Sequence, residues 1–160
     1  MIIETGEGLP NADSYASQED TAIYHSDRGN TQWVMTTDAG QISALIRATD
    51  YLDGHYRAHG LPLNATQGLQ WPRAGDGAVP RAVRHATMIL ALEALTGPLT
   101  GRAERGVKSI TESAEGVGST STTYDDALPT DLYPHVTAIL GDVATLRSAG
   151  GGVWTGRVIK

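Results

Sequence analysis

Two stretches of the chain repeat apolar positions at i, i+3, i+4 and i+7, the spacing of one face of an α-helix. In the first, which Asp38 caps and which fades near Gly60, the inward positions are Ile42, Leu45, Ile46, Thr49, Leu52 and Tyr56. The positions expected to face water there are Arg47, Asp50, Asp53 and Arg57. In the second, which Pro80 opens as the first helical residue and Gly97 closes, apolar residues occupy most of the circumference: Val83, Ala86, Thr87, Ile89, Leu90, Leu92 and Ala94. The pattern predicts two buried helices, of which the second is central.

Two shorter helices are indicated on either side of this pair. Ser17 and Asp20 have the spacing of a capping box, which predicts a short helix ending at Gly29. Its expected buried residues are Ala22, Ile23 and Tyr24. A fourth helix is expected over residues 131–147, where one face carries Val136, Ile139, Leu140, Val143 and Leu146. Residues 1–16 contain turn-forming Gly and Pro, which predicts an extended leader with turns.

Between the second long helix and the last helix, the sequence is rich in Thr, Ser and β-branched residues. Residues 107–112 and 119–124 flank the turn sequence Glu115–Gly118, which predicts a β-hairpin over about residues 106–124. A two-stranded hairpin is marginally stable alone, so it should lean on the domain or on another subunit. A surface loop is the alternative for a segment with so much Ser, Thr and Gly.

The chain ends in an apolar segment behind a glycine hinge. Gly150, Gly151 and Gly152 form a flexible joint, which divides the chain into a domain of residues 1–149 and an arm of residues 150–160. An exposed apolar strand tends to aggregate, so this arm should bind a partner by strand addition or fold back onto its own domain. The residues expected to make the contact are Val153, Trp154, Arg157, Val158, Ile159 and Lys160.

Together these elements predict a mainly α protein: a small bundle of about four helices with a β-hairpin insertion and an extended C-terminal tail. The length of 160 residues suits one domain. The chain contains no cysteine, which excludes disulfides and thiolate metal sites. It shows neither a signal-peptide pattern nor an apolar run of the ~20 residues that a membrane span needs, so we expect a soluble protein made in the cytoplasm.

The formal net charge is −6, from 18 acidic and 12 basic residues, which counts against strong nucleic-acid binding. A basic cluster nevertheless surrounds the start of the second long helix, where Arg73, Arg81, Arg84 and His85 follow Trp71. The residues that could bind single-stranded DNA by stacking and charge are Trp71, Arg73, Arg81 and Arg84. The alternative is that these basic residues form local ion pairs with the acidic residues that are in excess. The scarcity of aromatic residues favours this alternative.

No sequence pattern indicates catalysis, a cofactor or a metal. The chain has no phosphate-binding P-loop, no nucleophile elbow and no zinc-protease motif. His55 and His59 have the spacing of helical metal ligands, with Asp53 nearby, but no third ligand is suggested and a solvated helix end is favoured. Asp125 and Asp126 are better explained as solvated residues before a turn than as a catalytic pair. We therefore expect a protein that is not an enzyme.

Three sequence blocks resemble those of a phage and prophage protein family. They are residues 8–15 (GLPNADSY), 44–53 (ALIRATDYLD) and 67–73 (QGLQWPR). Members of this family are often described as DnaT-like single-stranded-DNA-binding proteins, and they are similar to the head–tail connector, or adaptor, subunits of tailed phages. The blocks are specific together and weak singly. The resemblance covers most of the chain from the leader through the second long helix.

The resemblance implies a structural subunit of the phage neck. Such subunits form a ring, expected to hold about twelve copies, that joins the portal protein to the next component, a stopper or tail terminator. The C-terminal arm would grip the portal, and packaged DNA would pass through the channel without specific binding, which an acidic chain favours. The implied location is the neck of the virion at the portal vertex, after synthesis in the host cytoplasm. The alternative is the single-stranded-DNA-binding role.

Overall fold

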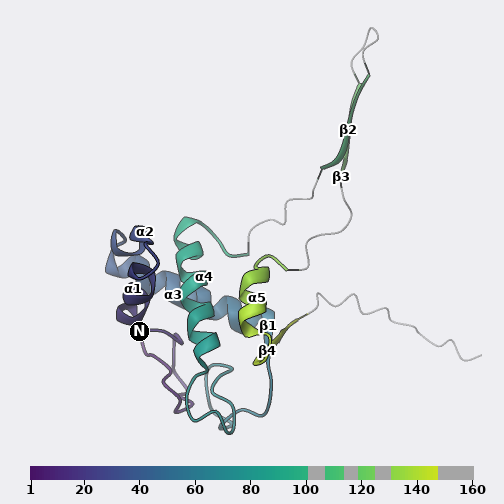
Figure 1. Ribbon diagram of the computed structural model, residues 1–160. Helices are drawn as coiled ribbons and strands as arrows, with labels where there is room; N and C mark the ends of the chain where they lie inside the picture. Colours follow the sequence, from purple (N-terminus) through teal and green to yellow (C-terminus); the bar gives the residue numbers. More distant parts are fainter. Residues whose placement is uncertain (101–106, 114–118, 125–130, 148–160) are drawn as a thin grey trace, which may run out of the picture.

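A computed structural model describes residues 1–100, 107–113, 119–124 and 131–147 (Figure 1). Its helices are α1 (Gln18–Ser26), α2 (Thr31–Val34), α3 (Asp38–His55), α4 (Arg81–Thr96) and α5 (Pro134–Leu140). Its strands are β1 (Tyr56–Ala58), β2 (Val107–Ser113), β3 (Ser119–Tyr124) and β4 (Ala144–Leu146). The mainly α class with a hairpin insertion is confirmed. None of the described helices combines the length and hydropathy that crossing a membrane requires.

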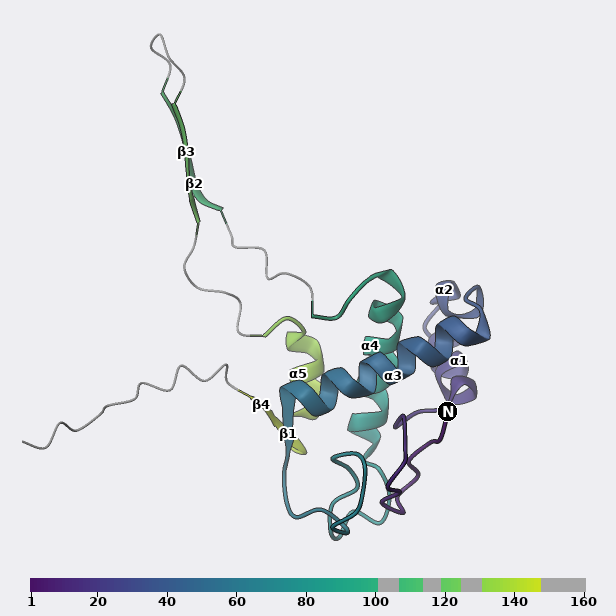
Figure 2. The same ribbon diagram turned by 180° about the vertical axis from the view of Figure 1, so that it is seen from behind.

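Helices α3 and α4 form the centre of the fold. Figure 2 shows α3 crossing α4, and α5 packs against α4. The predicted inward stripes are largely confirmed, because buried positions recur at helical spacing on both helices. On α3 they include Ala44, Leu45, Ala48, Thr49 and Leu52. On α4 they include Val83, Ala86, Thr87, Leu90 and Ala94.

The core contains fully buried tyrosine and tryptophan in a chain that has no phenylalanine: Tyr15, Trp33, Tyr56 and Trp71. A buried tyrosine needs a hydrogen-bond partner for its hydroxyl. The hydroxyl oxygens of Tyr56 and Thr137 lie 2.8 Å apart, which joins the end of α3 to α5. Tyr56 therefore connects two elements through a polar contact as well as through packing, whereas the buried Trp33 Nε1 has no hydrogen-bond partner among the described residues.

Helix α1 begins as predicted but buries a different face. The Ser17 side chain caps it, which confirms the predicted N-terminus. Its buried residues are Thr21 and His25, whereas Ile23, predicted to be buried, is 56% exposed. The reason is a tertiary contact: His25 Nε2–H donates to the Met88 carbonyl oxygen at 2.9 Å and turns the Thr21–His25 face towards α4.

Several helix boundaries also differ from the prediction. Helix α2 was not predicted, because four residues are too few to show a period, although it buries Trp33. The N-cap of α3 is Thr37 rather than Asp38, and its hydroxyl accepts a hydrogen bond from the Gly40 N–H at 3.3 Å. Pro80 occupies the N-cap of α4 instead of its first helical position.

The helix predicted over residues 131–147 is wrong in its second half. Helix α5 ends at Leu140, and β4 pairs antiparallel with β1, with Tyr56 opposite Leu146 and Ala58 opposite Ala144. Tyr56, predicted as the last helical position of α3, is instead the C-cap of that helix and the first residue of β1. The pairing provides hydrogen-bond partners for backbone N–H and C=O groups of residues 56–58 and 144–146. These segments are far apart in the sequence, so a helical period could not indicate that they pair.

The predicted hairpin is confirmed. Strands β2 and β3 pair antiparallel, with Ile110 opposite Thr122 and Ser113 opposite Ser119. They lie between α4 and α5 in the chain and form a sheet separate from β1 and β4. The predicted hinge at Gly150–Gly152 and the arm of residues 153–160 lie outside the described residues.

Candidate nucleic-acid interface

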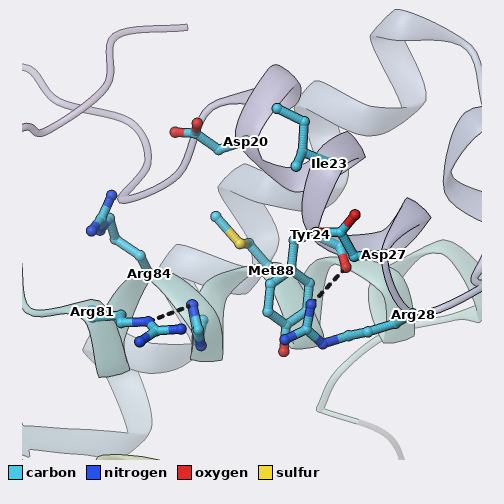
Figure 3. A pocket seen from close by; sticks show the side chains of 9 residues that line it. Asp20, Ile23, Tyr24, Asp27, Arg28, Arg81, Arg84 and Met88 are labelled. Atoms are coloured by element: carbon cyan, nitrogen blue, oxygen red, sulfur yellow. Dashed lines mark hydrogen bonds between the residues drawn. The ribbon is translucent and has the colours of Figure 1, made fainter.

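A groove between α1 and α4 brings together basic side chains from two distant parts of the sequence (Figure 3). Its volume is about 290 Å³. Its walls come from α1, the turn after α1 and the first half of α4, and the lining residues are Asp20, Ile23, Tyr24, Asp27, Arg28, Arg81, Arg84, His85 and Met88. Three guanidinium groups and two carboxylates line the groove, so it has a local excess of positive charge in an acidic protein.

Tyr24 organises the α1 wall of the groove. Arg28 Nη1–H donates to the Tyr24 carbonyl oxygen at 2.9 Å, and Arg28 Cζ lies 3.5 Å from the centre of the Tyr24 ring. This distance is typical of a cation–π contact, which fixes the guanidinium against the ring. The His85 ring lies next to the same tyrosine, with 4.9 Å between ring centres. Tyr24 thus holds a basic residue of the α1 side close to a histidine of α4.

The α4 wall carries two arginines in the first turn of the helix. Arg81 Nε–H donates to His85 Nε2 at 3.3 Å, which requires that this nitrogen carry no proton. Burial lowers the pKa of His85, and the nearby charges of Arg81, Arg28 and Arg84 lower it further. His85 is therefore a neutral acceptor among three cations. The acceptor of the Arg28 hydrogen bond is a backbone carbonyl, and the acceptor of the Arg81 hydrogen bond is an imidazole nitrogen. Neither of these two acceptors is a carboxylate.

The structure brings together two of the four residues predicted for DNA contact. Arg81 and Arg84 line the groove, whereas Trp71 and Arg73 lie in the loop before α4. Trp71 is 1% exposed and packs edge-on against Tyr15, with 5.5 Å between ring centres. The predicted stacking of bases on Trp71 is therefore wrong. The Arg73 Nη2–H group donates to Gln70 Oε1 at 3.4 Å, within the same loop.

Sequence reasoning missed Tyr24 and Arg28 as groove residues. Their i, i+4 spacing around the end of α1 is a weak signal, since such pairs are common on helix surfaces. What places them opposite Arg81 and Arg84 is the packing of α1 on α4, which the buried His25 fixes.

The three blocks that carry the family resemblance meet in one hydrogen-bonded junction. Tyr15 from the first block donates its hydroxyl to Asp53 Oδ1 of the second block at 2.6 Å. In the third block, the Gln70 backbone N–H donates to Asp53 Oδ2 at 3.0 Å, and the Trp71 backbone N–H donates to Tyr15 Oη at 3.3 Å. The blocks therefore join the leader, α3 and the loop before α4, which is an architectural role.

Burial dominates the electrostatics of this junction. It raises the pKa of Tyr15, and the charge of the Asp53 carboxylate raises it further. Burial also raises the pKa of Asp53, while its hydrogen bonds with Tyr15 and Gln70 act in the opposite direction. Asp53 was predicted on the wetter side of its helix, but it is half-buried in this network. The prediction failed because the partners come from distant segments.

The histidine pair considered as metal ligands is separated by the end of a helix. Helix α3 stops at His55, whose ring stacks on Tyr51 with 4.0 Å between ring centres. His59 lies beyond β1, with its Nε2 2.7 Å from Thr145 Oγ1. The helical ligand spacing suggested for the pair is therefore wrong. Among the residues that the structure describes, no group of three or more His, Asp or Glu side chains is arranged to hold a metal ion. Asp125 and Asp126 lie outside those residues.

Comparison with known proteins assigns the chain to a family. A family model described as "Putative DnaT-like ssDNA binding protein" matches residues 1–159, which include both walls of the groove and all three blocks of the junction. No curated protein and no solved structure gives a significant match. Because the match covers nearly the full length, the chain belongs to this DnaT-like family.

Proposed function

We propose that the protein binds single-stranded nucleic acid through the groove between α1 and α4, in line with the description of its family. The observation that carries the proposal is the convergence of Arg28, Arg81 and Arg84 from two segments on one groove. Arg28 is held against Tyr24 and Arg81 against His85, so a phosphate could bind both without displacing a carboxylate from these contacts. The planar guanidinium group suits bidentate contact with phosphate oxygens.

The groove predicts weak binding directed at the sugar–phosphate backbone. Three arginines can neutralise at most about three phosphates, so the logarithm of the affinity should fall with the logarithm of salt concentration with a slope of about −2. Trp71 is buried, and the Tyr24 ring already contacts Arg28 and His85. Base stacking should therefore contribute little, and binding should depend weakly on sequence.

Fluorescence anisotropy with a labelled oligothymidine at low salt tests the proposal. The Arg84→Gln variant should bind more weakly, and its salt slope should be smaller in magnitude by about 0.7, because one phosphate contact is lost. Arg57→Gln is the matched control, since it makes the same charge change at an exposed position of β1. No binding at low salt, or equal losses in both variants, would overturn the proposal.

The hairpin favours a second candidate, a structural subunit of a phage neck. Strands β2 and β3 pair with each other and with no other described strand, and such a sheet needs a supporting surface. Val34 is 63% exposed and Met35 84% exposed, which adds apolar surface available for a partner. In this proposal, a ring of about twelve copies sits between the portal and a stopper or tail terminator, with the C-terminal arm on the portal.

Binding to purified heads that contain the portal tests this second candidate. Truncation after Ala149 should abolish binding, because it removes the hinge and the apolar arm, while Arg57→Gln should leave binding unchanged. Undiminished binding of the truncated chain would contradict the role of the arm. Failure of the full chain to bind such heads would contradict the neck assignment itself, and oligothymidine binding would then decide for the first candidate.

A further inference from the structure

His85 lies among the arginines of the groove as an acceptor without its own positive charge. Its Nε2 accepts the Arg81 Nε–H at 3.3 Å, and its ring contacts Tyr24. The titratable and charged groups that line the groove around it come from the α1 side and from α4: Asp20, Tyr24, Asp27, Arg28, Arg81 and Arg84. An incoming phosphate would approach the same arginines that now surround the imidazole.

We infer that His85 is an additional phosphate ligand, which takes up one proton from solvent when a phosphate group enters the groove. This inference rests on the proposed nucleic-acid binding at the same site. A bound phosphate draws the Arg81 guanidinium to itself, and the His85 Nε2 lone pair is then free. The proton binds there to give imidazolium, whose new N–H donates to a phosphate oxygen. No other bond forms or breaks.

Electrostatics give the direction of the coupling. In the empty groove, burial first and then Arg81, Arg28 and Arg84 hold the pKa of His85 below its ordinary value. A phosphate compensates the charge of those arginines and gives the imidazolium a partner, so it raises this pKa. Linkage is reciprocal: if a bound phosphate raises the pKa of His85, then protonation of His85 must raise the affinity for the phosphate. Affinity should therefore rise as pH falls, by at most about tenfold per pH unit for one proton.

The test is the affinity for oligothymidine at constant ionic strength between about pH 8 and pH 6, the range in which a histidine titrates. The wild-type protein should gain about fivefold or more in affinity over this range, and His85→Gln should change by less than about twofold. His135→Gln is the matched control, because His135 is an exposed histidine on α5 outside the groove. It should retain the wild-type slope.

An NMR titration of the His85 imidazole in the wild-type protein gives a second readout that does not depend on a variant. Addition of oligothymidine should raise the pKa of His85, which a merely structural histidine would not show. Binding with the same pH slope in the wild-type and His85→Gln proteins, or an unchanged imidazole titration, overturns this inference and leaves the proposed function standing. Absence of binding at every pH overturns both.

Discussion

At the scale of single residues, buried polar side chains fix segments that have little regular secondary structure. Glu4 is 1% exposed, and its carboxylate accepts backbone N–H groups at 2.6–3.0 Å from Gly6, Glu7, Gly8 and Leu9. Gly8 has φ +69°, and a Cβ at this position would lie 2.4 Å from Asn64 Nδ2. The glycines predicted a turn in the leader, but its central acceptor could not be recognised from the sequence.

Replacement of this acceptor should destabilise the leader. Glu4→Gln keeps the size of the side chain but removes the charge and turns one acceptor into an NH2 donor that faces backbone N–H groups. We expect a loss of about 2 kcal/mol in the free energy of unfolding, measured by urea denaturation. Glu7→Gln is the control, because Glu7 is an exposed neighbour in the same turn. Equal stability of the two variants would contradict this role of the Glu4 carboxylate.

His25 should make stability depend on pH. It is 1% exposed, its Nε2–H donates to Met88, and burial lowers its pKa. Because the unfolded chain binds the proton more readily, the contribution of neutral His25 is complete above about pH 6.5 and declines as pH falls below it.

Urea midpoints at about pH 7.5 and pH 5.5 measure this effect. The wild-type midpoint should fall between the two conditions, and His25→Gln should show a smaller fall from a lower starting stability. The exposed His135 provides the comparison, since His135→Gln should behave like the wild type. An equal fall in all three proteins would assign the pH dependence to other groups.

At the scale of elements, the local sequence pattern predicted the two long helices. The conformation of shorter segments depends on contacts between residues that are distant in the sequence. Helices α3 and α4 were predicted because many turns share one apolar stripe. Val143 and Leu146 fit the face of a helix, yet residues 144–146 are a strand because β1 lies beside them. The same distinction applies to the groove between α1 and α4. Arg81 and Arg84 lie on one helix and were predicted together, whereas Tyr24 and Arg28 join them only through the packing of α1 on α4.

The junction of Tyr15 and Asp53 should couple the leader to α3. Tyr15→Phe removes a hydroxyl that donates to Asp53 Oδ1 and accepts from the Trp71 N–H, so we expect a loss of about 2 kcal/mol. A double-mutant cycle with Asp53→Asn should give a coupling energy of about 1 kcal/mol or more. Asp38→Asn, at an exposed position at the other end of α3, should show no coupling with Tyr15→Phe. Additive effects of the first pair would contradict the junction.

At the scale of the whole molecule, an acidic chain carries a basic groove. The net charge of −6 repels a polyanion at long range, whereas the three arginines attract it at contact. Long-range repulsion acts mainly on the association rate and is screened by salt. The affinity of the groove is therefore the result of two opposing electrostatic effects with different ranges.

Removal of acidic residues outside the groove should speed association without altering its lining. Asp142→Asn combined with Glu93→Gln changes two exposed positions that do not line it. Stopped-flow measurements with oligothymidine should show an association rate about twofold higher at low salt and unchanged above about 0.5 M salt. A gain that persists at high salt would indicate a new contact instead of weaker repulsion.

The antiparallel pair of β1 and β4 has a practical consequence for measurement. The pair follows the C-terminal end of α3, whereas α1 contacts the other end through the 3.1 Å hydrogen bond between Gln18 and Gln41. The 18 residues of α3 separate these ends by about 27 Å. Because the chain has no cysteine, Arg57→Cys would provide a single thiol at the far end. Attachment through this thiol would tether every molecule to a sensor surface at the same position, at the end of α3 opposite the end that α1 contacts.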